Sequence, residues 1–145
     1  YTKRRGFAVF REKDKDGKFI AIKEAGLFYS FETWLAAFLV QVEGHSYPEA
    51  QVGLGRSDLI VNIRGEEMLF ECKKYAGERQ FIKGHGQLAY YARSLGQKRA
   101  IYVVFTPEHL RYPDTITAGR AIVRNVEIIT YLIPYDEVKD FATDD

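Results

Sequence analysis

The chain has 145 residues, of which 46% are hydrophobic and 14% aromatic, and its formal net charge is +1. This length and apolar content suit a single globular domain over residues 1–145 and leave little room for a second core. The nearly neutral charge excludes a generally basic protein, so any binding of nucleic acid has to use local patches.

Cysteine content and hydropathy limit the kinds of site that the chain can form and the cellular compartment that we expect for it. Cys72 is the only cysteine, which excludes an intramolecular disulfide and any cysteine-built zinc or iron-sulfur centre. No apolar run reaches the roughly 20 residues that cross a membrane, and the amino terminus lacks a signal-peptide pattern. We therefore expect a cytoplasmic domain with no membrane contact. Its first residue is Tyr1 rather than Met, as in a domain excised from a longer protein.

The first predicted elements are a hairpin and a helix. Residues 7–22 predict a β-hairpin, because Asp16-Gly17 lies in a polar cluster between two apolar runs. An α-helix is predicted next, with Ser30 as its N-cap and its end before Gly44. Its apolar stripe has helical spacing and comprises Phe31, Trp34, Leu35, Phe38, Leu39 and Val42.

Two runs of alternating apolar and polar residues, 58–63 and 68–73, predict an antiparallel hairpin. We place its turn at Gly65 and Glu66. One face of the hairpin is then apolar and comprises Leu59, Val61, Ile63, Met68, Phe70 and Cys72.

The opposite face of this hairpin carries charged residues. In the predicted register Asp58 lies opposite Lys73, and Ile60 lies opposite Glu71. Side chains two residues apart share a face, and diagonal cross-strand neighbours lie within about 7 to 8 Å. Asp58, Glu71 and Lys73 are therefore expected to converge.

The rest of the chain predicts further α/β structure. Residues 78–95 have apolar positions at helical spacing, and Gly96 is a suitable helix C-cap. A short strand over 100–105, a loop over 107–120 and one or two strands over 121–133 follow. The pattern indicates one mixed α/β domain.

A local excess of positive charge lies in the middle of the chain. Residues 56–99 hold nine cations against five acids, although a mixed solvated surface would have the same composition. The cations are Arg56, Arg64, Lys73, Lys74, Arg79, Lys83, Arg93, Lys98 and Arg99. His85 falls in an apolar helix stripe and is expected to be a hydrogen-bonded core histidine.

The charged face of the hairpin has a catalytic and a structural interpretation. Two carboxylates at this spacing can share a divalent cation, while the adjacent ammonium neutralises developing negative charge. Alternatively, Asp58 and Lys73 form an ordinary ion pair in solvent. Ile60 and Leu69 share the charged face, which indicates that a helix covers it, and carboxylates held there need a partner or a metal.

Three motifs in order support the catalytic interpretation. Gly55-Arg56-Ser57-Asp58, a short hairpin and Glu71-Cys72-Lys73 resemble the G-R-x-D … E-x-K signature of the PD-(D/E)xK nuclease superfamily. Gln87-Leu88-Ala89-Tyr90-Tyr91 resembles the Q-x-x-x-Y element of its RecB-like branch. The resemblance spans roughly residues 31–105. It implies a restriction-endonuclease-like core, a mixed central sheet flanked by helices in the order αβββαβ, here with an added N-terminal hairpin.

The resemblance also implies roles for these residues. It implies that Asp58 and Glu71 are ligands of Mg²⁺ or Mn²⁺, with the backbone carbonyl of Cys72 as a third ligand, and that Lys73 is the catalytic lysine. Hard cations prefer such oxygen ligands. Ser57 stands where the name of the superfamily has proline.

Further site residues are implied on the two helices. Many members of the superfamily place an acid on the leading helix, where Glu32 is the best match and Glu43 and Glu49 are rivals. A helix-capping role for Glu32 is the alternative. Gln87 and Tyr91 are i, i+4 neighbours that the family would aim at the active site, unless they are an ordinary half-buried pair.

The sequence therefore predicts a metal-dependent nuclease that hydrolyses phosphodiester bonds of DNA. The alternative is a non-catalytic module of the same fold that binds nucleic acid or regulates a partner. A weaker resemblance to nuclease-like domains appended to bacterial AAA-type ATPases implies an ATPase or helicase module as partner, in cis or in trans. A homodimer is compatible with the same resemblance.

Overall fold

The computed structural model describes residues 14–18, 22–48 and 58–136, with the backbone alone for Pro48 and Asp58. Over these residues the protein is α/β, with two helices and a six-stranded mixed sheet. In chain order the elements are α2 (Glu24–Gln41), β1 (Gly44–Pro48), β2 (Asp58–Ile63), β3 (Glu66–Lys74), α3 (Glu78–Ser94), β4 (Arg99–Pro107), β5 (Gly119–Val123) and β6 (Val126–Tyr135). None of the helices in these segments is long and apolar enough to cross a membrane.

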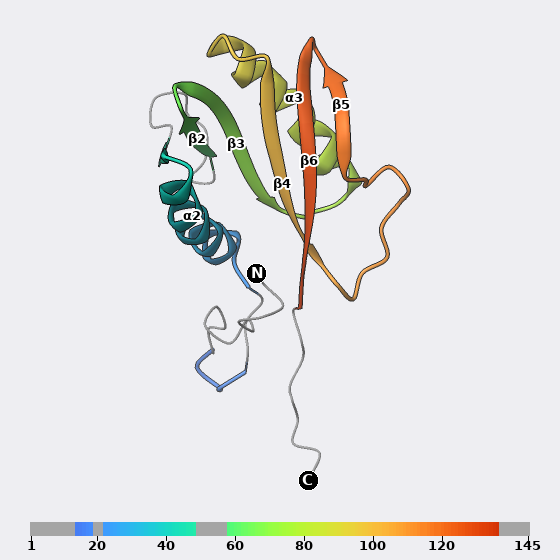
Figure 1. Ribbon diagram of the computed structural model, residues 1–145. Helices are drawn as coiled ribbons and strands as arrows, with labels where there is room; N and C mark the ends of the chain where they lie inside the picture. The colour runs from blue at the N-terminus through green and yellow to red at the C-terminus, as the bar shows by residue number, and fades with distance from the viewer. Residues whose placement is uncertain (1–13, 19–21, 49–57, 137–145) are drawn as a thin grey trace.

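The sheet combines two antiparallel ends with a parallel centre (Figure 1). Its strand order is β1-β2-β3-β4-β6-β5. The pairs β3-β4 and β4-β6 are parallel, and all the others are antiparallel. Because parallel neighbours need a crossover, α3 connects β3 to β4 across one face of the sheet.

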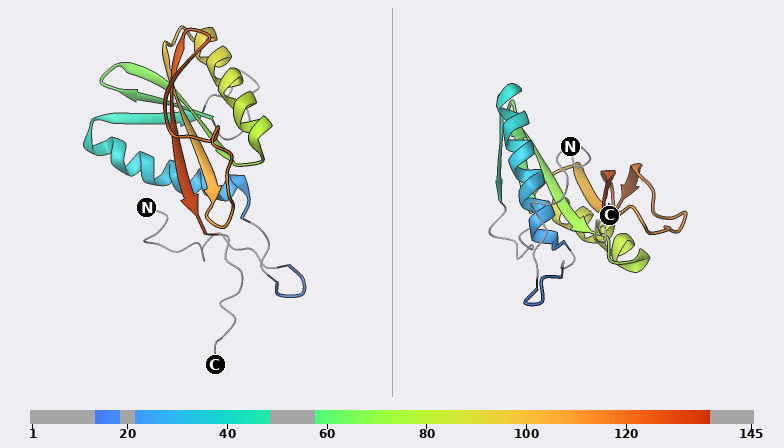
Figure 2. Two further views of the ribbon diagram at one scale, coloured as in Figure 1. Left: turned by 90° about the vertical axis from the view of Figure 1, so that its right-hand side faces the viewer. Right: turned by 90° about the horizontal axis from the view of Figure 1, so that it is seen from below.

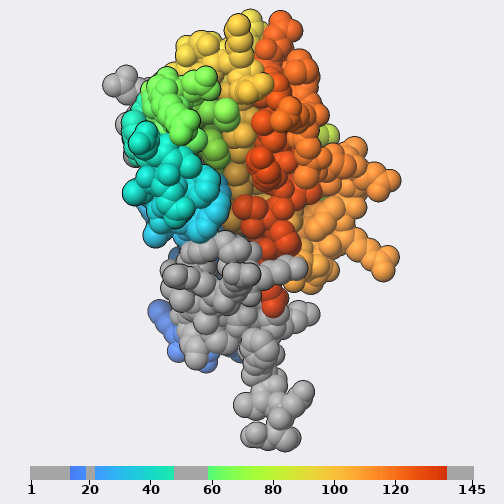
Figure 3. Space-filling view, in the orientation of Figure 1, coloured from blue at the N-terminus to red at the C-terminus, as the bar shows by residue number. Residues whose placement is uncertain are grey.

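The two helices cover opposite faces of the sheet (Figure 2). The core under α2 comprises Leu27, Phe28, Phe31, Leu35 and Leu39 with Leu59, Val61, Cys72, Ile101, Val103 and Phe105. The core under α3 comprises Phe81, Leu88, Ala89 and Ala92 with Ile60, Leu69, Tyr102, Val104 and Ile128. On the α2 side, β6 (red in Figure 3) reaches the surface beside the helix, where Tyr131 is 53% exposed.

The first helix begins earlier than the sequence predicts. α2 starts at Glu24, its N-cap is Lys23 without a side-chain capping bond, and Ser30 lies inside the helix. The prediction of Ser30 as N-cap was therefore wrong. Leu27 and Phe28 are buried against the sheet, so tertiary packing extends the helix past a residue that would otherwise cap it.

The central hairpin also turns one position earlier than predicted. Arg64 and Gly65 form its two-residue turn with φ of 52° and 85°, which is the backbone of a type I′ turn. Asp58 consequently pairs with Glu71, not with Lys73. The register differs from the predicted one by two residues, so every side chain keeps its predicted face.

The second helix was predicted correctly. α3 ends at Ser94, and Gly96 has a φ of 71°. The amide of Gly96 donates to the carbonyl of Arg93, and the amide of Gln97 donates to that of Ala92. This pair of bonds is the Schellman arrangement, for which glycine is the favoured residue.

The remaining strands match the prediction except at the sheet edge. β4 covers the predicted strand 100–105, and β5 and β6 form a hairpin over the last predicted segment. The edge strand β1 was not predicted, because Gly44–Pro48 has no alternating apolar pattern. Of the predicted hairpin over 7–22, the turn at Asp14–Lys18 is present, while its strands lie outside the described residues.

Candidate active site

A buried carboxylate stands at the centre of the predicted site. Glu71 lies on the β3 face that α3 covers and is 4% exposed. Its neighbours Ile60 and Leu69 belong to the core under α3, so the predicted covering of the charged face is confirmed. Glu71 Oε1 lies 3.4 Å from Lys73 Nζ. Glu71 Oε2 is buried and has no hydrogen-bond partner among the described residues.

The electrostatics of Glu71 follow from this burial. Desolvation raises the pKa of the Glu71 carboxyl group, and the negative charge of Glu24 raises it further. Lys73 opposes the shift through its charge and its hydrogen bond. Since burial outweighs the lysine, a further cation at the unpartnered oxygen would stabilise the ionised carboxylate. The donor chemistry therefore fits a hard metal ion.

Asp58 lies directly across the ladder from Glu71. Opposite residues of an antiparallel pair have Cβ atoms about 4.5 to 5.5 Å apart on the same face, so the observed register brings Asp58 closer to Glu71 than the predicted one. The described side chains hold no group of three or more His, Cys, Asp or Glu residues suited to a metal. The Asp58 carboxylate is not among those side chains.

The acid that reaches Lys73 from α2 is Glu24. Its Oε1 lies 4.0 Å from Lys73 Nζ, and its Oε2 accepts a hydrogen bond from the Lys74 amide at 3.0 Å. Sequence reasoning missed Glu24 because it placed the helix start at Ser30. If the predicted helix had begun before Phe28, Glu24 would have been recognised as an acid in its first turn.

The acids predicted for this role lie elsewhere. Glu32 is about two turns further along α2 than Glu24. Glu43 follows the carboxyl end of α2, in a turn with a φ of 57°. Glu49 lies outside the described residues. Of the acids on α2, the one in contact with Lys73 is thus Glu24 and not the predicted Glu32.

Lys73, the cation of the candidate site, lines a pocket of about 270 Å³. Its walls include Glu24, Lys73, Gln87 and Tyr102, together with Gln80, Phe81 and Gly84. The structure thus brings Gln87 of α3 to the same pocket as the lysine of β3. This pocket is where a substrate could reach Lys73.

The side chains of Tyr91 and Cys72 do not line this pocket. Tyr91 is packed partly against the core under α3 and lines a neighbouring hollow that it shares with Gln87. The Cys72 thiol is fully buried on the opposite face, under α2. Only the backbone carbonyl of Cys72 could therefore serve as a ligand, as the resemblance implies.

Tyr102 lies at the site, although the sequence offered it only as one of several tyrosines that could stack on bases or pack in the core. It pairs with Glu71 across the β3-β4 ladder and is 2% exposed. Burial raises the pKa of Tyr102, and the charges of Glu71 and Glu24 raise it further. The phenol consequently stays protonated at neutral pH and can only contribute a neutral hydroxyl group.

Gly84 makes room for that hydroxyl group. A Cβ atom at Gly84 would lie 2.7 Å from Tyr102 Cζ and closer still to the hydroxyl oxygen. α3 can approach β4 this closely only because position 84 has no side chain. The sequence offers no signal for this contact, since nothing in it pairs position 84 with position 102.

His85 is hydrogen-bonded through both ring nitrogens, as predicted, but it is half-buried at the border of the core. Its Nδ1 lies 3.0 Å from the Phe81 carbonyl oxygen, and its Nε2 lies 2.8 Å from Thr130 Oγ1. Because the carbonyl can only accept, Nδ1 carries the proton and the neutral ring accepts the Thr130 hydroxyl at Nε2. The ring also contacts Phe81 and Tyr102 edge to face.

Acid should destabilise the protein through His85. Burial lowers the pKa of His85, against an opposing bond to Phe81. A lowered folded-state pKa gives stability that is present above about pH 6.5 and lost as pH falls through the lower folded value. Urea unfolding should show wild type losing more stability than His85→Gln between pH 7.5 and 5.5. An equal loss in both proteins, with exposed His109→Gln as control, would exclude His85 as the titrating group.

No family model, curated protein or solved structure matches this chain. The chemistry of the site has to be inferred from its own residues.

Proposed function

We propose that this protein is a metal-dependent nuclease that hydrolyses phosphodiester bonds of DNA. The observation that carries the proposal is the environment of Glu71. This buried carboxylate has one oxygen beside Lys73 and the other without a partner among the described residues. Asp58 is its direct cross-strand neighbour. Burying a carboxylate this way is costly unless a cation binds it, and a substrate phosphate would need the same cation.

The element order supports a restriction-endonuclease-like core, as in the PD-(D/E)xK superfamily, and the motif from Gln87 to Tyr91 supports its RecB-like branch. The order α2, β1, β2, β3, α3, β4 is a helix, three strands, a helix and a strand, as αβββαβ requires. In this proposal β5 and β6 extend the core. The acidic pair then sits on the second and third strands, and Gln87 on the following helix.

Asp58, Glu71 and the Cys72 carbonyl are the residues that would hold Mg²⁺ or Mn²⁺. These oxygen donors match the preference of hard cations. Glu24 is the helix acid of the site, and it acts through its contacts with Lys73 and the Lys74 amide. When bound, the ion would polarise the phosphate and lower the pKa of a water molecule.

The side chains of the pocket would bind and orient the substrate phosphate. Lys73, whose side chain is 32% exposed, can donate to a phosphate oxygen and neutralise the charge that develops there. Glu71 and Glu24 hold its ammonium group from two sides. Gln87 can orient the scissile phosphate through its side-chain amide, because it lines the same pocket.

A non-catalytic module is the second candidate, and the same ion pairs favour it. Lys73 contacts both Glu71 and Glu24, so the cluster is partly neutralised by its own residues. Such a cluster could stabilise the fold and leave DNA binding to other surfaces.

Calorimetry and cleavage assays distinguish the two candidates. We expect the purified chain to cleave single-stranded, double-stranded or branched DNA with Mg²⁺ or Mn²⁺ and not with EDTA, with RNA tested alongside. Titration with Mn²⁺ should give a saturating binding isotherm in wild type and not in Asp58→Ala. DNA binding without metal binding would favour the non-catalytic module. Absence of cleavage on every substrate, at metal concentrations that saturate the protein, would refute the nuclease proposal.

A further inference from the structure

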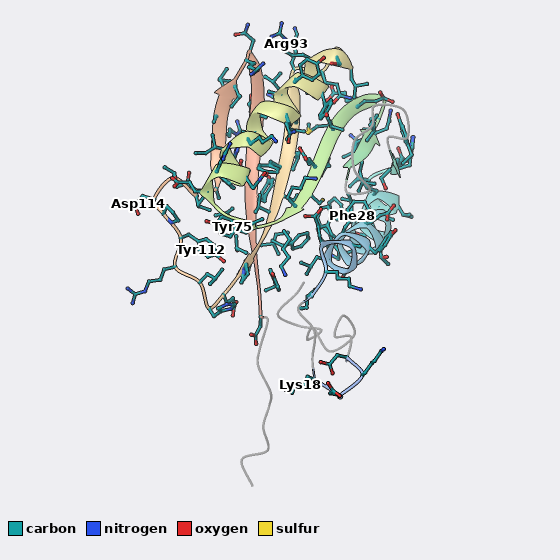
Figure 4. The ribbon with its side chains drawn as sticks, turned by 180° about the vertical axis from the view of Figure 1, so that it is seen from behind. Lys18, Phe28, Tyr75, Arg93, Tyr112 and Asp114 are labelled. Carbon is teal, nitrogen blue, oxygen red and sulfur yellow. The ribbon has the colours of Figure 1, made fainter. Side chains whose placement is uncertain are left out.

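A basic stretch of the chain includes most of α3 and the turn that follows it. Residues 79–99 contain five cations and no acid. These cations are Arg79, Lys83, Arg93, Lys98 and Arg99. Figure 4 shows α3 lying across the outside of the sheet, with Tyr75 near one end and Arg93 near the other. Three of these cations lie on α3, whereas Lys98 follows the helix and Arg99 begins β4 and is ion-paired with Glu127. A near-neutral protein thus has a local excess of positive charge along this helix, as a polyanion-binding surface requires.

A shallow hollow of about 540 Å³ lies on this surface. We call it the α3 hollow and define it by Lys83, Gln87, Tyr90, Tyr91 and Arg124. Arg124 belongs to the turn between β5 and β6, so two distant segments of the chain supply the positive charge. Neither Lys83 nor Arg124 forms an ion pair with the described residues, so both charges are available to a ligand.

The α3 hollow also presents an aromatic ring. Tyr90 is 60% exposed, and its ring meets that of Tyr91 at 5.6 Å with an interplanar angle of 70°. Tyr91 is itself partly buried against the core under α3. An exposed ring held in this way offers a flat face on which a nucleic-acid base can stack.

Gln87 connects the α3 hollow with the candidate active site. It lines both the hollow and the pocket that contains Lys73. On α3, Lys83, Gln87 and Tyr90 follow one another at i, i+4 and i+7, which is one continuous stripe of the helix surface. A chain that lies along this stripe would reach the pocket without crossing an acidic side chain of α3.

We propose that the α3 hollow binds single-stranded DNA and leads the strand to the candidate active site. Cations that track phosphates, combined with an aromatic ring for sequence-tolerant stacking, are the features that bind single strands. A duplex fits the surface less well, because its paired bases cannot stack on Tyr90. The inference that the hollow binds single-stranded DNA depends only on the residues of this surface. The inference that it leads the strand to the active site rests on the proposed nuclease function.

Fluorescence anisotropy with a labelled oligothymidylate, in EDTA, tests the binding. Lys83→Gln with Arg124→Gln should weaken binding about tenfold and reduce the slope of log affinity against log salt by about 1.4, for two lost phosphate contacts. Tyr90→Ser should weaken binding at least about fivefold with little change in the salt slope. The matched controls are Lys18→Gln, at the opposite end of the molecule from Arg93 (Figure 4), and Tyr131→Ser, a tyrosine 53% exposed on the other sheet face.

The outcomes separate this inference from the proposed function. The inference is overturned if the α3 variants bind like wild type, if the controls lose as much, or if duplex DNA binds as tightly and responds equally. Single-strand binding that depends on Lys83, Arg124 and Tyr90 supports it, even if the protein never cleaves DNA. If wild type and the α3 variants cleave DNA at the same metal-dependent rate, the proposed nuclease function is supported. The same result would show that the α3 hollow does not lead the strand to the active site.

Discussion

Replacing Lys73 by Gln should reduce metal-dependent DNA cleavage by about a thousandfold while leaving metal affinity nearly unchanged. Lys73 Nζ lies 3.4 Å from Glu71 Oε1, and its ammonium group is the protein cation that the proposal places against the phosphate. Loss of one group that stabilises transition-state charge typically costs about a hundredfold to a thousandfold in rate. Single-turnover cleavage measures the rate, and Mn²⁺ calorimetry measures the affinity.

Glu71→Gln is the informative partner of this variant. It should abolish both cleavage and Mn²⁺ binding, yet unfold at a higher temperature than wild type in EDTA. The neutral amide avoids the cost of a buried charge, a gain on the order of 1 kcal/mol or about 2 to 4 °C for a chain of this size. Lys73 retains Glu24 as an ionic partner in this variant.

Lys74→Gln is the matched control for the lysine. The Lys74 ammonium donates to the Ile22 carbonyl at 2.8 Å and lies 5.8 Å from the Tyr135 ring centroid. Its loss should lower stability and change the cleavage rate less than about tenfold. If Lys73→Gln cleaves as fast as Lys74→Gln, Lys73 has no catalytic role.

Gly84→Ala is expected to be the most destabilising single-methyl change in α3. The new Cβ would lie 2.7 Å from Tyr102 Cζ, within a fully packed core. Overpacking of this kind costs about 1 to 3 kcal/mol, and the buried Tyr102 ring has little room to yield. We expect a loss of about 2 to 3 kcal/mol in urea unfolding. Cleavage should fall as well, because α3 carries Gln87 into the pocket.

Gly86→Ala is the control on the same helix. A Cβ atom at Gly86 meets nothing within 4 Å, so alanine should stabilise α3 by about 0.5 to 1 kcal/mol through backbone entropy. Tyr102→Phe should recover part of the loss in a Gly84→Ala background, since it removes the hydroxyl group nearest to the new methyl group. If Gly84→Ala and Gly86→Ala change the stability equally, helix propensity and not the contact with Tyr102 determines the effect of Gly84→Ala.

The sequence by itself determined the elements with strong local signals. Alternation in 58–63 and 68–73 predicted β2 and β3, and helical spacing closed by Gly96 predicted α3. Which residues share a face was predicted even though the register was wrong by two positions, because side chains alternate with period two. That Glu71 and Lys73 share one face of the hairpin follows from that alternation alone, and it places Asp58 on the same face in either register.

Only the tertiary structure decided the start of α2, the edge strand β1 and the surroundings of the site. α2 extends back to Glu24 because burial of Leu27 and Phe28 outweighs the capping preference of Ser30. That extension brings Glu24, not Glu32, to Lys73. The contact between Gly84 and Tyr102, likewise, joins residues whose proximity depends on how α3 packs on β4. Local sequence determines the faces of the elements, whereas packing between distant elements determines which residues meet.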